Sequence, residues 1–226
     1  MKIAIRILIL GLSILGCSAF AQNLELPPNL ISINSDIGKE LLTSSTARDD
    51  YSPLIKHYVT QSNQAYCGVA SMVMVINALS NSPVLTQDNF FDNQKTSKVT
   101  SANGIRRRGM NLETLGKLLE SYDIKVKFYH ASNTNLFEFR QLISNNLKQP
   151  NNYVVINYLR KAIGQESGGH ISPIAAYNKE TDRFLILDVS SYKYPPVWVK
   201  VEELWQAINT VDSDGGRTRG FVLVSK

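Results

Sequence analysis

Four residues of the chain could together perform nucleophilic catalysis by a thiol. Cys67 opens an apolar segment of helical periodicity, and Gln61 stands six residues before it. His170 follows two glycines, and Asp188 follows an apolar run. A helix N-terminus carries about half a positive charge and lowers the pKa of a thiol placed there. Thiol acyl transfer needs a thiolate, a group that moves protons and donors to the oxyanion, so we predict Cys67 as the nucleophile and His170 as its base.

Residues 1–21 have the composition of a secretory signal peptide. A basic start precedes the apolar run 7–15, which is shorter than the about 20 residues that span a bilayer, and Ala-Phe-Ala at 19–21 is a cleavage signal. We expect cleavage after residue 21, export to the periplasm and no stable membrane insertion afterwards. Lipoprotein processing at Cys17 is the alternative, although the residues before it fit the lipobox pattern only loosely.

The charge of the chain is moderately positive. Cleavage would lower the formal charge from +5 to +3, because Lys2 and Arg6 leave with the signal peptide. The only basic cluster is Arg106-Arg107-Arg108, which lacks interleaved aromatic residues and precedes an expected helix. A solvated turn is therefore expected there, and a nucleic-acid partner is not.

The remaining sulfur and imidazole groups give no sign of a metal site. After cleavage Cys67 is the only cysteine, so no intramolecular disulfide can form, and on local grounds it could equally be a buried structural thiol. His57, His130 and His170 are scattered, so they form no soft-ligand cluster with it. His57 and His130 match no catalytic motif and are expected to be ordinary surface or partly packed residues.

The elements that must position these residues are expected to form one domain, residues 22–226, of the α+β class. Helices dominate the first half and strands the second, after a polar N-terminal arm over residues 22–33. The helix that begins at Cys67 is apolar nearly all round and should be the central buried helix. The double proline at 195–196 excludes a regular central strand there. The expected helices are Asp36–Leu42, Cys67–Ser80, one from about Asn111, Leu136–Leu147 and Val201–Ile208; the expected strands are Ile124–Tyr129, Tyr153–Leu159, His170–Tyr177, Phe184–Val189 and Phe221–Val224.

Several segments, in the same order along the chain, resemble the phytochelatin synthase family. The first is Gln61-Ser62 followed by Ala65-Tyr66-Cys67-Gly68, and the match covers roughly residues 52–226. The nucleophile motif of papain itself is absent. The other matching segments are Arg160-Lys161, Gln165, Gly169-His170-Ile171-Ser172-Pro173-Ile174, Leu185-Ile186-Leu187-Asp188-Val189, Lys193-Tyr194-Pro195-Pro196-Val197-Trp198-Val199 and Arg219-Gly220-Phe221.

The resemblance implies a papain-like cysteine protease fold, in which a helical layer carries the nucleophile and packs against an antiparallel sheet. Cys67 matches the acyl-accepting nucleophile, His170 the general base and acid, and Asp188 the group that orients the imidazole. Gln61 matches the oxyanion-hole side chain, which acts beside the backbone N–H of Cys67. Loss of one such donor can cost about 10²–10³ in rate.

The resemblance also implies glutathione as substrate and partner, cut at its Cys–Gly bond through a γ-glutamylcysteinyl thioester. The γ-glutamyl head carries an ammonium and a carboxylate, so its recognition needs a carboxylate and a guanidinium close together. Asp212 and Arg219 match the family positions for that task, Asn157 matches another contact, and Gly169 would offer backbone to the same ligand. On local grounds Asp212 could equally be a turn residue and Arg219 a surface cation. No cofactor is required, and cadmium would enter as a metal–glutathione thiolate substrate.

The chain departs from the plant members of this family in several features. Ile171 replaces a phenylalanine, residues 175–178 replace a Gly-Gly-Tyr-His pattern, and the sequence ends at Lys226 without a cysteine-rich second domain. These features resemble the short bacterial members, so hydrolysis to γ-glutamylcysteine and glycine is expected to exceed transpeptidation. The sequence is compatible with a homodimer as well as with a monomer.

Two other functions fit parts of the pattern. Leader-peptide proteases of bacteriocin exporters also combine a glutamine, a downstream Cys-Gly and a later histidine and aspartate, but they are normally fused to a membrane transporter. A non-catalytic metal- or thiol-binding protein is the second alternative, and the lack of a soft-ligand cluster argues against it. Release of glycine from glutathione separates these functions.

Overall fold

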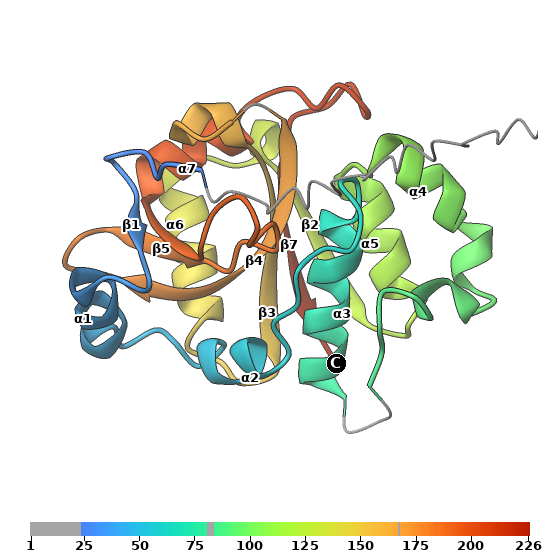
Figure 1. The fold of residues 1–226 in the computed structure, drawn as a ribbon, viewed down its shortest axis with the longest axis horizontal. Helices are drawn as coiled ribbons and strands as arrows, with labels where there is room; N and C mark the ends of the chain where they lie inside the picture. The colour runs from blue at the N-terminus through green and yellow to red at the C-terminus, as the bar shows by residue number, and fades with distance from the viewer. Residues whose placement is uncertain (1–23, 81–83, 167) are drawn as a thin grey trace, which may run out of the picture.

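The computed structural model describes residues 24–80, 84–166 and 168–226. The predicted signal peptide and the alternative lipidation site at Cys17 lie outside the described residues. The strands form one seven-stranded sheet in the order β1-β6-β5-β4-β3-β7-β2, with every neighbouring pair antiparallel (Figure 1). The strands are β1 (Ile31–Ser32), β2 (Lys125–His130), β3 (Asn152–Leu159), β4 (Gly169–Asn178), β5 (Arg183–Ile186), β6 (Val197–Lys200) and β7 (Gly220–Ser225).

Four of the α-helices begin at a capping side chain. Ser35, Ser101, Asn111 and Asn135 each accept a hydrogen bond from the backbone N–H three residues on, which satisfies a donor that a helix start leaves unpaired. The α-helices are α1 (Asp36–Ser44), α2 (Tyr51–Lys56), α3 (Cys67–Leu79), α4 (Ala102–Arg108), α5 (Leu112–Glu120), α6 (Leu136–Asn146) and α7 (Val201–Ile208); short 3₁₀ turns cover Phe90–Asp92, Thr96–Lys98, Ala131–Asn133 and Arg160–Ile163.

Helix α3 is the central buried helix, as its composition predicted. Its side chains are buried all round, because one side packs on the sheet and the others meet α2 and α5. Tyr153 and Val155 of β3 face this layer together with Val222 of β7. The sheet therefore holds the helix that begins with the candidate nucleophile.

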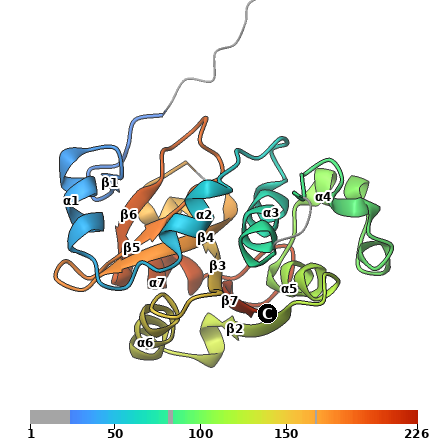
Figure 2. The same ribbon diagram turned by 90° about the horizontal axis from the view of Figure 1, so that it is seen from below.

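The opposite face of the sheet is covered as well, by α6 and α7 (Figure 2). Val154, Ile156 and Tyr158 of β3 face this second layer and pack with Phe139 of α6 and Leu204 of α7. The expectation of a single helical layer was thus incomplete. The apolar run Tyr153-Val154-Val155-Ile156 of β3 is typical of a strand that is buried on both faces.

Mixed helices and an antiparallel sheet agree with the predicted α+β class, but some elements were missed. The strand expected over Phe184–Val189 ends at Ile186, so Asp188 lies in the loop that follows β5. The arm over residues 22–33 joins the sheet, because Ile31 of β1 pairs with Trp198 of β6. Helices α2 and α4 were not expected either. None of the helices among the described residues is long and apolar enough to cross a membrane.

Candidate active site

Cys67 is positioned where α3 meets the start of β4. The Ser71 hydroxyl, one turn into the helix, donates to the carbonyl oxygens of Cys67 at 2.7 Å and Ile171 at 3.1 Å, which ties the helix to the strand. Gly68 allows close packing, since a Cβ there would lie 2.5 Å from the Met110 sulfur. The thiol is half-buried and lines a cavity.

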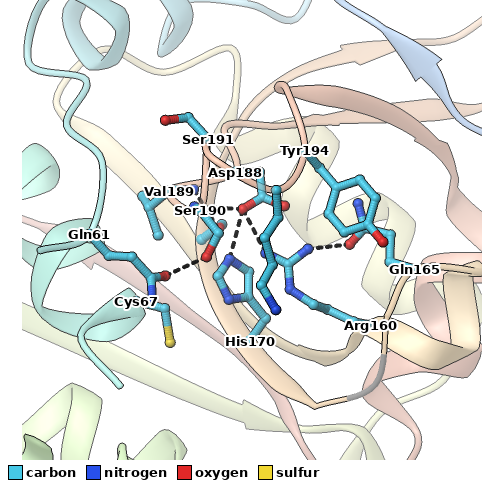
Figure 3. Close-up of polar contacts among 12 residues, drawn as sticks. Gln61, Cys67, Arg160, Gln165, His170, Asp188, Val189, Ser190, Ser191 and Tyr194 are labelled. Carbon is cyan, nitrogen blue, oxygen red and sulfur yellow. Dashed lines mark hydrogen bonds and ion pairs between the residues drawn. The ribbon is translucent and has the colours of Figure 1, made fainter. Parts of the chain in front are cut away.

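His170 lies next to Cys67 and is oriented by Asp188 (Figure 3). Its Nε2 is 2.9 Å from Asp188 Oδ1, which leaves Nδ1 as the nitrogen for proton exchange with the thiol. His170 of β4 pairs with Tyr158 of β3. The Tyr158 ring packs edge-to-face against the imidazole, with the two ring centres 5.7 Å apart. The imidazole is buried and held from two sides.

The electrostatics of this group favour a thiolate–imidazolium pair. Burial disfavours the thiolate, but the hydrogen bond and charge of His170, with smaller contributions at the backbone of Ile171 and Gly68, lower the pKa of Cys67. Burial likewise disfavours the imidazolium, but the charge and hydrogen bond of Asp188 raise the pKa of His170 above its ordinary value. At Asp188 the charge and hydrogen bond of His170 oppose the effect of burial, and the pKa of the carboxyl is lowered.

Arg160 is a member of this site that the sequence did not reveal. Its Nη2 donates to Asp188 Oδ1 at 2.8 Å, and the backbone N–H of Ser190 donates to the same oxygen at 2.8 Å. The guanidinium also donates to Gln165 Oε1 and lies 5.4 Å from the centre of the Tyr194 ring. Arg160 and Gln165 stood in matching segments, but their link to Asp188 arises only when β3, β4 and the loop after β5 come together.

The side chain of Gln61 makes hydrogen bonds within the turn that precedes Cys67. Its Oε1 accepts from the Ser190 hydroxyl at 2.6 Å, and its Nε2 donates to the carbonyl oxygens of Asn63 and Gln64, both at 2.9 Å. Figure 3 shows the hydrogen bond between the Gln61 amide and Ser190. In this arrangement both Nε2 hydrogens are used inside the turn. The oxyanion role of Gln61 stays a prediction, and it requires the amide to release one of these carbonyls.

A cavity of about 510 Å³ gathers the other predicted residues around the thiol. Asn157, Gly169, Asp212 and Arg219 line it together with Cys67 and His170, although they come from β3, β4 and the segment before β7. All four predicted substrate contacts therefore share one cavity with the predicted nucleophile and base. Their roles toward a substrate stay predictions.

Asp212 and Arg219 form an ion pair in the wall of this cavity. Arg219 Nη2 lies 3.5 Å from Asp212 Oδ1, Arg219 Nη1 donates to the Val211 carbonyl at 2.7 Å, and Asn157 Nδ2 donates to Asp212 Oδ2 at 2.8 Å. A Cβ on Gly169 would lie 2.9 Å from Arg219 Nη2, so the glycine makes room for the guanidinium. Arg219 is 5% exposed, which excludes a surface cation, whereas Asp212 also accepts turn hydrogen bonds through its backbone.

The expectation of a solvated turn at Arg106, Arg107 and Arg108 is confirmed for their exposure but wrong for their local structure. They form the last turn of α4 and line the same cavity as Cys67, although their side chains remain exposed. Helix α4 could not be predicted from the sequence, because its seven residues show little apolar periodicity.

The other histidines lie away from this cavity. His130 is buried and structural, with Nε2 2.9 Å from Glu113 Oε1 and Nδ1 2.6 Å from the Thr218 carbonyl, so it ties β2 to α5 and to the segment before β7. His57 follows α2, and partial burial with the nearby charge of Lys56 lowers its pKa. Within the described part of the chain, no group of three or more His, Cys, Asp or Glu side chains could hold a metal ion.

Comparisons with known proteins identify the family of the chain. The family model described as phytochelatin synthase matches residues 21–221. Glutathione gamma-glutamylcysteinyltransferase 1 of Lotus japonicus is 33% identical over 205 residues, 88% of this chain and 41% of that protein, and the Arabidopsis thaliana protein of the same name is 32% identical over 215 residues, 92% and 44%. The enzyme of Schizosaccharomyces pombe is 26% identical over 206 residues, 88% and 50%. The chain spans half or less of these relatives' lengths, and it belongs to the phytochelatin synthase family.

Proposed function

We propose that the protein transfers the γ-glutamylcysteinyl group of glutathione through a thioester on Cys67, on a papain-like fold. The observation that carries the proposal is the cavity that Cys67 and His170 share with the Asp212–Arg219 pair. A nucleophile and a proton carrier thereby lie beside a charge pair that suits the head group of an amino acid. The relatives' name, glutathione gamma-glutamylcysteinyltransferase, supports the substrate.

The reaction has two halves that use the same residues. In the first, Cys67 Sγ attacks the cysteinyl carbonyl of glutathione, His170 gives its proton to the glycine nitrogen, and the C–N bond breaks to release glycine. In the second, water or an amine attacks the thioester, His170 takes the proton, and Sγ leaves as the thiolate. Asp188 keeps the imidazole in the orientation that serves both halves. The backbone N–H of Cys67, with Gln61 if its amide turns, would stabilise the oxyanion.

We assign recognition of the γ-glutamyl head to the Asp212–Arg219 pair in the cavity wall. Arg219 would bind the head-group carboxylate and Asp212 the ammonium, with Asn157 holding Asp212 in place. Arg219 Nε is buried without a hydrogen-bond partner among the described residues, so a carboxylate could use a donor that the free protein leaves unpaired. The backbone of Gly169 completes this part of the cavity.

We further propose that water is the main acceptor of the acyl group. Water needs only access to His170, whereas a second glutathione must be held with its amine at the thioester. Among the residues that line the cavity, Asp212–Arg219 is the one hydrogen-bonded carboxylate–guanidinium pair, which suffices for one head group. Cadmium would enter bound to glutathione sulfur, as part of a substrate. A time course with and without cadmium should give mainly γ-glutamylcysteine and glycine, and dominant (γ-Glu-Cys)₂-Gly would reverse this conclusion.

Glycine release from glutathione tests the proposed function. The protein should release glycine and γ-glutamylcysteine, and Cys67→Ser should retain at most a few per cent of the rate. A protein that instead cut a double-glycine leader peptide and left glutathione intact would be a leader-peptide protease. Tight cadmium binding without turnover of either substrate would point to the non-catalytic alternative.

A further inference from the structure

The cavity around Cys67 carries more positive than negative side chains. Its charged lining consists of Arg106, Arg107, Arg108 and Arg219 against Asp212 and Asp214, besides His170. Arg219 and Asp212 bind each other. Asp214 offsets one of the three arginines of α4, and an excess of positive charge remains that the proposed recognition of the γ-glutamyl head does not use.

The substrate has one charge for which that recognition provides no partner. Glutathione carries two carboxylates and one ammonium, and the Asp212–Arg219 pair accounts for the carboxylate and the ammonium of the γ-glutamyl head. The second carboxylate belongs to the glycine that leaves. It lies within about one residue length, about 3.8 Å between Cα atoms, of the bond that is cut, so its partner must be close to Cys67.

Arg106 is the arginine of α4 that is best placed for this carboxylate. Its guanidinium lies 5.6 Å from the centre of the Tyr66 ring, and Tyr66 is the buried residue directly before Cys67. Such a cation–π contact holds the guanidinium at the cavity without using its N–H donors. Arg107 and Arg108 also line a neighbouring hollow with Ser101, whereas Arg106 lines only the cavity of Cys67 among the hollows described.

The donors of Arg106 are available to a ligand. None of the ion pairs formed by the described residues includes it, and its side chain is exposed. The chain turns sharply after α4 at Gly109, whose φ of +76° favours glycine. Met110 then packs against Gly68 of α3, which fixes the end of α4 next to the nucleophile.

We propose that Arg106 binds the carboxylate of the leaving glycine, with Arg107 and Arg108 adding to the local positive potential. This inference rests on the proposed function and adds a subsite on the leaving-group side of the scissile bond. A guanidinium can meet a carboxylate with two parallel N–H donors, which fixes orientation as well as position. Arg106 would thereby orient the peptide bond of glutathione for attack by Cys67.

The test compares glutathione with its glycine amide, which lacks only that carboxylate. The wild-type protein should cleave glutathione about tenfold faster in kcat/KM than the amide, and Arg106→Ala should lose about tenfold on glutathione while changing little on the amide. Arg106→Gln, which removes the charge but keeps a polar side chain, should behave alike if Arg106→Ala folds poorly. Lys117→Ala, at an exposed cation of α5 away from the cavity, is the matched control and should leave both rates unchanged.

Binding to a Cys67→Ala background, measured by calorimetry, separates this inference from the proposed function. Glutathione should bind this variant more tightly than its amide, and Arg106→Ala in the same background should remove the difference. Equal affinities for the two ligands, or equal losses on both when Arg106 is replaced, would overturn the subsite. A preference for the carboxylate in a protein that releases no glycine would keep the subsite and contradict the proposed function.

Discussion

The side chain of Asp188 makes its hydrogen bonds through a single carboxylate oxygen. His170, Arg160 and the backbone N–H of Ser190 all donate to Oδ1, while Oδ2 is buried without a hydrogen-bond partner among the described residues. The Tyr158 hydroxyl is also buried without such a partner. All side-chain hydrogen bonds of Asp188 therefore depend on Oδ1. A substitution that changes this oxygen should change the orientation and the pKa of His170.

Replacement of Asp188 by asparagine should shift the pH dependence of the reaction. His170 must be protonated to deliver a proton to the leaving amine, and Asp188 raises its pKa. The alkaline limb of kcat/KM should therefore move to lower pH in Asp188→Asn, with a rate loss of about 10²–10⁴ and a smaller change in substrate binding. If the variant merely unfolds, or its alkaline limb stays in place, Asp188 has a structural role and the assignment is wrong.

Replacement of Arg160 should shift the same limb in the opposite direction. The charge of Arg160 lowers the pKa of His170, so Arg160→Gln should move the alkaline limb to higher pH. Asp188 would also lose a buried partner, which should lower the free energy of unfolding by up to about 3–5 kcal/mol. Arg140→Gln breaks the ion pair with Asp182 and is the control, since it should affect stability alone. A coincident pH profile for wild type and Arg160→Gln would exclude this positioning role.

At the scale of the elements, long segments could be predicted from the sequence and short ones could not. Helix α3 ends within one residue of its expected end, because its apolar residues recur with helical spacing. Strand β1 has two residues and exists only through its pairing with β6, which no local pattern reveals. Helix α2 has six residues and contains a proline, and α4 ends in three arginines. Tertiary contacts outweigh local propensity in such short elements.

The start of α2 should make the stability of the fold depend on pH. Burial, with a smaller effect of the charge of Asp49, raises the pKa of Asp50 from 3.8 to about 9, and both carboxylate oxygens are buried without a hydrogen-bond partner among the described residues. The folded protein then holds a proton that the unfolded chain has lost. The contribution of Asp50 to the free energy of unfolding is fully present below about pH 4. It declines as the pH rises toward 9, by at most about 1.4 kcal/mol per pH unit.

The variant Asp50→Asn should remove this decline. Urea unfolding at pH 5, 7 and 9 should give a flatter pH dependence and a higher free energy of unfolding at pH 9 than in the wild type. The Asp88→Asn variant is a control, because Asp88 is an exposed aspartate. Parallel pH dependences for the wild type and Asp50→Asn would show that Asp50 is ionised in the folded state.

At the scale of the whole molecule, the candidate site forms where distant segments meet. Cys67 comes from a helix start, His170 from β4, and Arg219 from the residue before β7. The resemblance to a known family supplied these residues from the sequence, since each matched a motif. No role could be predicted for Arg106 and Arg160, because Arg106 contacts Tyr66 and Arg160 binds Asp188, both distant in the sequence. A cavity between layers cannot be seen in local periodicity.

Substrate selection should depend on the linkage of the head group. Arg219→Ala would leave the head-group carboxylate without its partner and should lower kcat/KM on glutathione by about 10²-fold. The α-linked tripeptide Glu-Cys-Gly should be a poor substrate of the wild type, because its head group cannot meet Asp212 and Arg219 together. Arg217→Ala, which breaks an exposed pair with Glu113, is the matched control. Equal rates on the α- and γ-linked peptides would remove the Asp212–Arg219 pair from the substrate site.

Cys67 should carry the acyl group during turnover, and the intact mass of the protein would reveal this intermediate. Samples mixed briefly with glutathione and quenched in acid should contain protein that is heavier by one γ-glutamylcysteinyl group. Peptide mapping should locate the added group on Cys67, and Cys67→Ala should not gain it. Glycine release without any acylated protein, or an acyl group that maps to another residue, would show that Cys67 is not the nucleophile.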